Sequence, residues 1–155
     1  MKIQLGDKMK AVVQRVLRAN LKVDGELISE IDKGYVVFLG VGKGDTQKDG
    51  DYFIKKLPAL RIFEDENGKI NVNIVDAGGE ILLVSQFTLF ADTSHGNRPS
   101  FINAELPEPA NELYEYVLEG LRKQGLSVKK GVFGGDMKIE QVNDGPFTVL
   151  MDSKS

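Results

Sequence analysis

Short stretches of alternating or continuous apolar residues predict β-strands along most of the chain. Residues 11–17 (AVVQRVL) are rich in β-branched side chains, and residues 21–31 (LKVDGELISEI) alternate on either side of Asp24-Gly25. An Asp-Gly pair between two such runs is typical of a β-hairpin turn. Residues 34–42 (GYVVFLGVG) form a continuous apolar run, which suits a central strand. The N-terminal part therefore predicts a hairpin followed by a buried strand.

The apolar spacing changes to the helical period in two places. Thr46 is placed to cap a helix, with Asp49 three residues later in a capping-box position, and Pro58 limits how far this helix continues. A second helix is expected after Pro107 and before Gly125, which suits a C-cap. The buried stripes would be Tyr52, Phe53, Ile54 and Leu57 in the first helix and Leu113, Val117, Leu118 and Leu121 in the second.

The other segments are again typical of short strands. They are residues 61–74 (two strands around Asn67-Gly68), 126–133, 137–142 and 147–152. The sequence shows no internal repeat and no linker, so residues 9–155 are expected to form a single α+β domain with about eight or more strands and two main helices. Met9 begins a segment that itself looks like a protein start, and residues 1–8 are expected to be a mobile N-terminal extension.

Composition restricts the chemistry. The chain has 155 residues, 41% of them hydrophobic, and no apolar run reaches the roughly 18 residues that a membrane span requires. There is no cysteine, which excludes thiol nucleophiles, disulfides and zinc-thiolate sites. The N-terminus has no apolar signal segment. These features predict a cytoplasmic protein that does not contact a membrane.

Charge and histidine content exclude further classes. The net charge of −3 does not favour a general electrostatic binder of nucleic acid, and we expect no DNA partner. His95 is the single histidine, so a histidine-rich metal site cannot form within one chain. A Ser-His-Asp triad could use only this residue. We therefore expect neither a metal nor an organic cofactor.

A polar break follows the apolar run ILLV. The next residues, SQFTLFAD (85–92), place Ser85, Gln86 and Thr88 on both faces of an extended chain. One interpretation is a strand that leaves the core for a loop, since residues 92–97 are typical of a turn. The other is a strand end that lines a pocket, where hydroxyl and amide groups offer directed hydrogen bonds. The pattern alone leaves both open.

Residues 143–152 (NDGPFTVLMD) are a second candidate. Asn, Asp, Gly and Pro all favour turns, so a hairpin turn is expected between the strands at residues 137–142 and 147–152. Gly145-Pro146 directly precedes the second of these strands. Glycine lets another backbone approach closely, and proline is rigid. The same residues could therefore act as a probe into a neighbouring cavity.

Two loops carry further candidates. In HGNRPSF (residues 95–101), His95 and Arg98 either belong to a plain surface loop or meet a phosphate. In GVFGGDM (residues 131–137), Phe133 is either a core residue or a platform on which a base stacks. The glycines of this segment match no nucleotide-binding fingerprint. Neither loop is long enough to decide between its two interpretations.

Taken together, these motifs resemble the D-aminoacyl-tRNA deacylase family. SQFTLFAD (85–92) and NDGPFT (143–148) resemble its two signature motifs. AVVQRV, RIFEDENGK, RPSF and GVFGGDM are similar to family segments in the same order, and the resemblance extends from Met9 to Asp152. It implies a three-layer α/β/β fold with a partly closed β-barrel and two main helices. It also implies a homodimer with active sites at the subunit interface.

The resemblance further implies which residues form the site. Each site would combine the SQFT strand end of one subunit with a Gly-Pro tip, joined by a cis bond, from the other. The implied residues are Ser85, Gln86, Phe87 and Thr88 for catalysis, Gly145 and Pro146 for chiral selectivity with Arg15 in support, and Phe133 and Arg98 for contact with tRNA and its terminal adenosine.

The implied reaction is hydrolysis of the ester bond of D-aminoacyl-tRNA, which releases the D-amino acid and tRNA. Backbone N–H groups at residues 85–88 would stabilise the oxyanion. The 2′-hydroxyl of the terminal adenosine would assist water, because the motifs contain no obvious side-chain base. A Gly-cis-Pro wall would reject L side chains by collision, so some hydrolysis of glycyl-tRNA is also expected.

Two other functions are open from the sequence. A non-catalytic module could bind the aminoacyl-adenosine end of tRNA without turnover. A conventional hydrolase could use Ser94 or Thr88 with His95. The chain also departs from the family pattern in two places: residues 93–97 are less basic, and Phe147 is bulkier than the expected Val or Ala.

Overall fold

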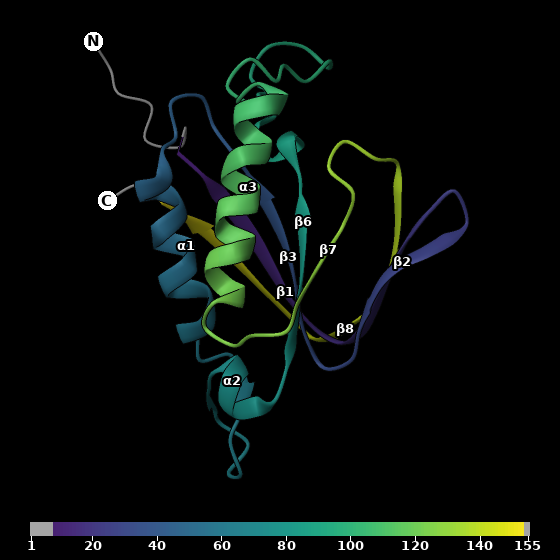
Figure 1. Ribbon diagram of the computed structural model, residues 1–155, viewed down its shortest axis with the longest axis vertical. Helices are drawn as coiled ribbons and strands as arrows, with labels where there is room; N and C mark the ends of the chain where they lie inside the picture. The colour runs from purple at the N-terminus through teal and green to yellow at the C-terminus, as the bar shows by residue number, and fades with distance from the viewer. Residues whose placement is uncertain (1–7, 154–155) are drawn as a thin grey trace.

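The computed structural model describes residues 8–153, which form eight β-strands, three α-helices and one 3-10 helix (Figure 1). The strands are β1 (Lys10–Val23), β2 (Glu26–Ile31), β3 (Gly34–Gly40), β4 (Phe63–Glu64), β5 (Ile70–Val72), β6 (Glu80–Ser85), β7 (Val128–Lys130) and β8 (Met137–Asp152). The helices are α1 (Gln47–Ala59), α2 (Ile74–Ala77), the 3-10 helix η1 (Phe87–Phe90) and α3 (Pro107–Arg122). Except for Lys8, the N-terminal extension expected from the sequence lies outside the described residues.

Strand β1 organises the sheet because it pairs along both of its edges. On one edge, its first half pairs with β3 and its last residues pair with β2. On the other edge, β8 runs antiparallel to it along almost its whole length. Strand β3 then pairs in parallel with β6, and β6 with β7. The sheet order is therefore β2-β1-β3-β6-β7, with β8 on the remaining edge of β1.

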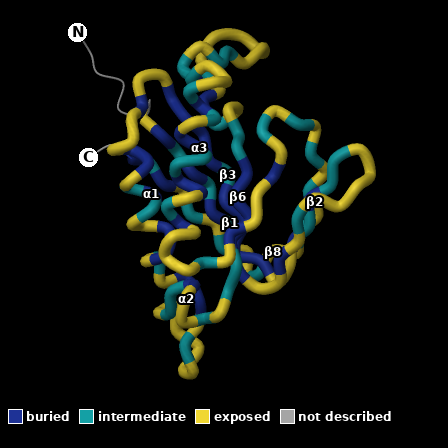
Figure 2. Tube along the Cα trace, in the orientation of Figure 1, coloured by how far each residue is buried: buried dark blue, intermediate teal, exposed yellow. Residues whose placement is uncertain are grey.

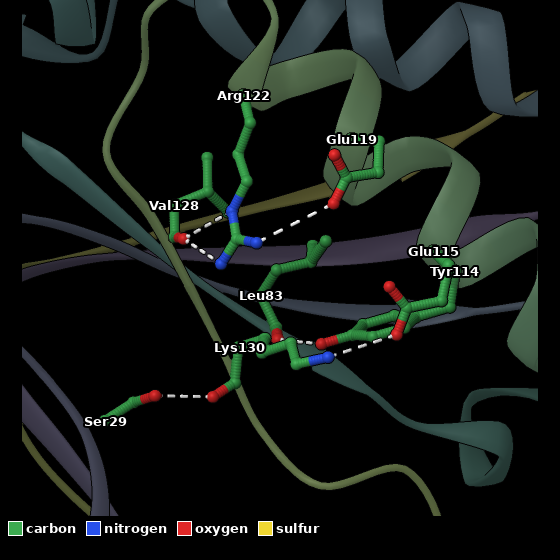
Figure 3. Close-up of polar contacts among 8 residues, drawn as sticks. All are labelled: Ser29, Leu83, Tyr114, Glu115, Glu119, Arg122, Val128 and Lys130. Carbon is green, nitrogen blue, oxygen red and sulfur yellow. Dashed lines mark hydrogen bonds and ion pairs between the residues drawn. The ribbon is translucent and has the colours of Figure 1, made fainter.

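The sheet curls until its two outer strands, β2 and β7, approach each other. Ser29 Oγ on β2 donates a hydrogen bond of 2.5 Å to the carbonyl oxygen of Lys130 on β7 (Figure 3). The enclosed side is filled by apolar residues, namely Val16, Ala19, Leu21, Ile31, Val36, Leu82 and Val84. This nearly closed barrel confirms the α+β fold class expected from the sequence.

The two main helices cover the other face of the sheet. Figure 2 shows the buried segments gathered in β1, β3 and β6 beside α1 and α3. The expected start of α1 is confirmed, because the Asp49 carboxylate accepts the Thr46 N–H at 2.9 Å, and Pro58 is the last residue but one of the helix. Among residues 8–153, no helix is long and apolar enough to cross a membrane.

Strand β8 differs from the prediction. The hairpin turn expected between residues 137–142 and 147–152 is wrong, because both segments belong to one strand of 16 residues. Strand β1 is long enough to pair with both, and the polar residues between them form an irregular bulge where the register shifts between Gln14 and Arg18. The Gly145-Pro146 pair thus lies on this bulge of β8 and not at the end of a hairpin.

Two predicted turns are confirmed, and one helix was not expected. Asp24-Gly25 joins β1 to β2 with both residues at positive φ, and Asn67-Gly68 lies between β4 and β5. The unexpected helix α2 has only four residues. It is capped by Asn73, whose side chain accepts the Asp76 N–H at 2.9 Å, and it ends at Gly78 with φ of 70°.

Two acidic side chains are buried where α1 begins. Asp45 and Asp49 are only 9% and 8% exposed. Asp49 accepts hydrogen bonds from the Thr46 N–H and the Ser153 hydroxyl, and Asp45 accepts one from the Gly42 N–H at 2.6 Å. Burial raises the pKa of Asp45 to about 7. The ionised form of Asp45 is therefore disfavoured in the folded protein.

We predict that wild type loses stability as the pH rises and Asp45 ionises, and that Asp45→Asn does not show this loss. The raised pKa means that the folded state binds a proton more tightly than the unfolded chain. This contribution is complete below the unfolded pKa of about 4 and is lost as pH rises through about 7. The difference in unfolding free energy between Asp45→Asn and wild type should therefore shift in favour of the variant by about 1–3 kcal/mol when the pH is raised from ~5 to ~8.

Urea denaturation at the two pH values measures this difference. Asp32→Asn, which removes an exposed carboxylate, is the control for the change in net charge. The same pH dependence in Asp45→Asn and wild type would contradict the prediction.

Candidate active site

A cavity of about 630 Å³ opens at the carboxyl end of β6, at the mouth of the barrel. Ser85, Gln86 and Phe87 line it where β6 ends, and residues 101–107 and the β7–β8 connection line other sides. Ligands of parallel sheets commonly bind beyond the carboxyl ends of the strands, and this volume suits a ligand of nucleoside size. The polar break after the ILLV run therefore lines a pocket.

The chain turns sharply at the end of β6. The prediction that residues 85–90 alternate between two faces of a strand is wrong, because β6 ends at Ser85 and η1 (Phe87–Phe90) follows. The turn is closed by a hydrogen bond from the Leu89 N–H to the Gln86 carbonyl oxygen at 3.4 Å. A tight turn at this point brings consecutive N–H groups close together.

The backbone N–H groups of this segment differ in how the fold uses them. The Gln86 N–H donates to the Leu39 carbonyl oxygen of β3 at 2.9 Å and so continues the ladder between β3 and β6. The N–H groups of Phe87 and Thr88 come first in η1, where no carbonyl of the same helix precedes them to act as acceptor. Phe87 and Thr88 therefore hold the donors of this segment that are suited to a ligand.

The Thr88 hydroxyl has an amide as its neighbour. Gln86 Nε2 donates to Thr88 Oγ1 at 2.6 Å. An amide takes up no proton at ordinary pH, so this contact orients the hydroxyl without activating it as a nucleophile. Thr88 is exposed and is not one of the residues that line the cavity.

Phe133 lines the cavity from the β7–β8 connection. It is partly buried, and its ring lies 6.3 Å from the ring of Tyr114 in the helix–sheet core. The sequence left open whether Phe133 is a core residue or a stacking platform. The ring packs against the helix–sheet core and also forms part of the cavity wall, so its surroundings agree with both interpretations. Phe87, which also lines the cavity, is 55% exposed and packs edge-to-face on Phe101 with ring centres 5.2 Å apart.

The Gly145-Pro146 tip, as we call this exposed pair, lies far from the cavity of its own chain. Its peptide bond is cis, as the family resemblance implied. Arg15 beside the bulge pairs with Tyr35, whereas Ser85 pairs with Leu39, four residues further along β3. This offset corresponds to roughly 13 Å along the strands, and the three strand spacings from β8 to β6 add about 14 Å across them. The tip does not line its own cavity.

Arg15 holds the residues on both sides of the Gly145-Pro146 tip. The side chain is only 5% exposed. Its Nε donates to the Asp144 carbonyl oxygen at 3.1 Å and lies 3.4 Å from Asp144 Oδ2. Nη1 donates to the Ile62 carbonyl oxygen at 2.7 Å, and the guanidinium lies 4.9 Å from the centre of the Phe147 ring. Arg15 of β1 thus links the tip to Ile62, the residue directly before β4.

The loop after η1 keeps its polar residues away from the cavity. Arg98 and His95 are exposed and do not line it. Ser94 Oγ donates to Asp92 Oδ1 at 2.6 Å, and this bond lowers the pKa of Asp92. Within residues 8–153, no hydrogen bond joins His95 to Ser94 or Thr88, and no group of three or more acidic or histidine side chains could hold a metal ion.

Sequence reasoning missed Tyr114 and Glu105. Tyr114 is 2% exposed and donates from its hydroxyl to the Leu83 carbonyl oxygen at 2.7 Å. Glu105 lines the cavity and accepts the N–H of Gly44 and of Leu106. The helical spacing places Tyr114 beside the apolar stripe of α3, and a hydroxyl in a buried stripe was the available signal. No pattern in the sequence marks Glu105.

The fold and the cavity together define the structural class of the protein. It is a small α+β protein with a nearly closed barrel and a ligand-sized cavity at the mouth of the barrel. The family profile described as D-Tyr-tRNA(Tyr) deacylase matches residues 12–152. The chain belongs to this family.

Curated relatives resemble the chain over nearly its whole length. The protein of Persephonella marina named D-aminoacyl-tRNA deacylase is 53% identical over 147 residues, which cover 95% of this chain and 99% of the relative. The protein of the same name from Syntrophomonas wolfei subsp. wolfei is 51% identical over 146 residues, covering 94% of this chain and 98% of the relative.

Solved structures match the fold. One, named "c-Myc DNA Unwinding Element Binding Protein", is 45% identical with a TM-score of 0.88 and covers 94% of this chain and 99% of its own. Another, described as a probable eukaryotic D-amino acid tRNA deacylase, has a TM-score of 0.81 over 93% of this chain and 98% of its own. At 16% identity this second likeness shows the fold alone.

We predict that Arg15→Lys lowers the free energy of unfolding by about 2 kcal/mol, because an ammonium cannot make the two directed bonds of the guanidinium and leaves a buried carbonyl unpaired. Arg18→Lys, an exposed position on the same strand, is the matched control. Urea denaturation at equal protein concentration measures both. Equal stability of the two variants would show that Arg15 does not hold the bulge.

Proposed function

We propose that the protein hydrolyses the ester bond of D-aminoacyl-tRNA and releases the free D-amino acid and tRNA. The family match over residues 12–152 carries this proposal. The nucleoside-sized cavity at the end of β6 supports it, because an aminoacyl-adenosine end is a ligand of that class. A chain without cysteine suits action in the cytoplasm.

The reaction depends on positioning rather than on a side-chain nucleophile. Water adds to the ester carbonyl carbon, negative charge develops on the carbonyl oxygen, and the bond to the tRNA 3′ oxygen then breaks as that oxygen takes up a proton. The N–H groups of Phe87 and Thr88 donate to the oxyanion, and one such donor can lower the barrier by about 3–4 kcal/mol. The Gln86 N–H takes no part, since Leu39 accepts it.

The attacking water is assisted by the 2′-hydroxyl of the terminal adenosine. The amide contact of Thr88 supports this assignment, because that contact offers no base to the hydroxyl. Ser85 and Gln86 shape the ester end of the cavity. An aminoacyl ester is already an activated acyl group, so orientation and oxyanion stabilisation suffice for its hydrolysis.

The terminal adenosine stacks on Phe133, and the rest of the tRNA lies outside the cavity. The position of Phe133 in the cavity wall supports this arrangement, because an aromatic face accepts any base by stacking. Arg98, exposed in the loop after η1, is available to a backbone phosphate.

The protein acts as a homodimer in which each cavity receives the Gly145-Pro146 tip of the partner subunit. The remoteness of the tip from its own cavity supports this assembly. So does the apolar surface near the tip, because Leu17 and Val142 beside the bulge are 50% and 37% exposed, and Leu150 further along β8 is 78% exposed. A second copy would remove this surface from water.

The tip reads chirality by exclusion. Backbone atoms of Gly145-Pro146 stand against the substrate Cα, so an L side chain collides with them while a D side chain points away. Many D side chains are therefore accepted. Glycine has no side chain to collide, so glycyl-tRNA is hydrolysed to some extent.

A second candidate function is DNA binding, because the solved relative that is 45% identical to this chain is named as a DNA-binding protein. The net charge of −3 of this chain favours DNA binding less than ester hydrolysis, since DNA affinity rests largely on cationic contacts with phosphates.

A binding module for aminoacyl-adenosine without turnover is distinguished from a deacylase by an assay for ester hydrolysis.

We predict rapid hydrolysis of D-tyrosyl-tRNA and little or none of L-tyrosyl-tRNA, each measured with and without a chelator, because the tip rejects the L side chain and the proposed chemistry uses no metal. The release of labelled tyrosine at several enzyme concentrations gives the two rates. Hydrolysis of neither ester by the folded protein would refute the proposed function, and equal rates would refute the selectivity.

We predict that Thr88→Ala and His95→Ala both keep at least about a tenth of the wild-type kcat, because losing a nucleophile or its base normally costs far more than tenfold. A triad mechanism with His95 requires the opposite result for His95→Ala. A second substrate, D-tyrosyl-tRNA ending in 2′-deoxyadenosine, should be hydrolysed slowly by wild type. Loss of turnover in a folded Thr88→Ala protein would contradict the assistance by the 2′-hydroxyl.

A further inference from the structure

The buried Tyr114 of α3 reaches β6, the strand whose last residue lines the cavity (Figure 3). Its hydroxyl donates to the Leu83 carbonyl oxygen at 2.7 Å, and Leu83 is two residues before Ser85 on β6. Burial raises the pKa of Tyr114, so the hydroxyl stays protonated and keeps this donor. Tyr114 is therefore bonded to the strand whose end forms the ester side of the cavity.

The carbonyl oxygen that accepts the Tyr114 hydroxyl is also bonded to the segment that leads to Phe133. The Gly131 N–H donates to the Leu83 carbonyl oxygen at 3.4 Å, so this oxygen accepts both the Gly131 N–H and the Tyr114 hydroxyl. The ladder between β6 and β7 ends at the pair Leu83–Lys130, so the hydroxyl lies where the ladder bonds stop. The chain leaves the sheet at Gly131 and reaches Phe133 two residues later.

Gly131, where the chain leaves the sheet, packs between the barrel interior and α3. A Cβ atom at Gly131 would lie 2.6 Å from the Met137 sulfur and 3.1 Å from Leu21 Cδ1, so a side chain at this position would displace its neighbours on the barrel side. On the helix side, the ring of Tyr114 packs at 6.3 Å from the ring of Phe133. Phe133 thus takes its position from the ring of Tyr114 and from the bond of Gly131 to the carbonyl oxygen that the Tyr114 hydroxyl also contacts.

Helix α3 is itself fastened to β7, so Tyr114 is held in place (Figure 3). Arg122 Nε and Nη2 both donate to the Val128 carbonyl oxygen, at 3.0 and 2.8 Å. Lys130 Nζ lies 3.4 Å from the Glu115 carboxylate. Both contacts come from residues that follow Tyr114 on α3, and they fasten this part of the helix to β7.

We propose that Tyr114 is a positioning residue that sets the separation between the ester end of the cavity, at Ser85–Thr88, and the adenosine platform, Phe133. The inference rests on the proposed function, in which Phe133 carries the terminal adenosine. Tyr114 does not line the cavity and acts through Leu83 and Phe133. It therefore governs affinity for the adenosine end of the substrate and leaves the chemical step unchanged.

The test measures binding of D-tyrosyl-3′-aminoadenosine, an amide analogue of the ester, by calorimetry. Tyr114→Phe keeps the ring and removes the hydroxyl, and it should weaken binding about tenfold, the size of one lost hydrogen bond. Tyr116→Phe is the matched control, because its hydroxyl lies on the same helix but donates to Asp51 at 2.6 Å. This control should bind as wild type does.

Two further measurements separate positioning from a general structural role. In a Phe133→Leu background, Tyr114→Phe should weaken binding no further, because the platform that it positions is already gone. With D-tyrosyl-tRNA as substrate, KM should rise about tenfold in Tyr114→Phe while kcat stays near that of wild type. Where Tyr114→Phe does not fold, Gly131→Ala displaces the same segment from the hydroxyl and should show the same loss of binding.

Unchanged affinity in Tyr114→Phe, or in Gly131→Ala where that variant is used, would overturn the inference. So would an equal loss in the Phe133→Leu background, or a fall in kcat at unchanged KM. Wild type that binds no analogue would overturn it as well. Wild type that binds the analogue but hydrolyses no D-tyrosyl-tRNA would refute the proposed function, and the expected binding differences would still support the role of Tyr114.

Discussion

The pairing of β1 on both of its edges is the constraint on which the rest of the structure depends. Backbone groups buried in a sheet need hydrogen-bond partners, and β1 provides them for β2 and β3 on one side and for β8 on the other. Strand β8 can therefore carry an irregular bulge without losing its place. Arg15 of β1 donates to the Asp144 carbonyl oxygen within that bulge. The Gly145-Pro146 tip consequently stands on a strand pair that is fixed along its length.

The same sheet separates the tip from the cavity. The cavity lies beyond the end of β6 and the tip lies on β8, with β1 and β3 between them. One chain cannot bring the two together while its strands stay paired, whereas a second copy can. The proposed division of labour follows from this geometry: one subunit orients the ester through Phe87 and Thr88 and stacks the adenosine on Phe133, and the other excludes L side chains.

Turn-forming residues in the sequence predicted the turns whose conformation depends on those residues alone. They failed where pairing with a strand distant in the sequence decides the conformation. Asp24-Gly25 formed the expected hairpin because its turn conformation depends on these two residues. Residues 143–146 carry equally strong turn formers, but the length of β1 keeps both flanking segments in one strand. Ser85, Gln86 and Phe87 of the predicted motif line a cavity and Thr88 does not, and the turn between them depends on contact with β3. The role of Tyr114 depends on where β6 and β7 stop pairing, which no spacing along the chain reveals.

A dimer with two different subunits tests the central claim most directly. One subunit carries Ala104→Trp, which fills the cavity that Ala104 lines, and the other carries Pro146→Gly, which removes the rigid wall of the tip. Alone, the first should be inactive and the second should hydrolyse L-tyrosyl-tRNA as well as D-tyrosyl-tRNA. In the isolated mixed dimer, the intact cavity faces an intact tip, so hydrolysis of the L ester should fall sharply while that of the D ester continues. Undiminished hydrolysis of the L ester per intact cavity would contradict a site shared between subunits.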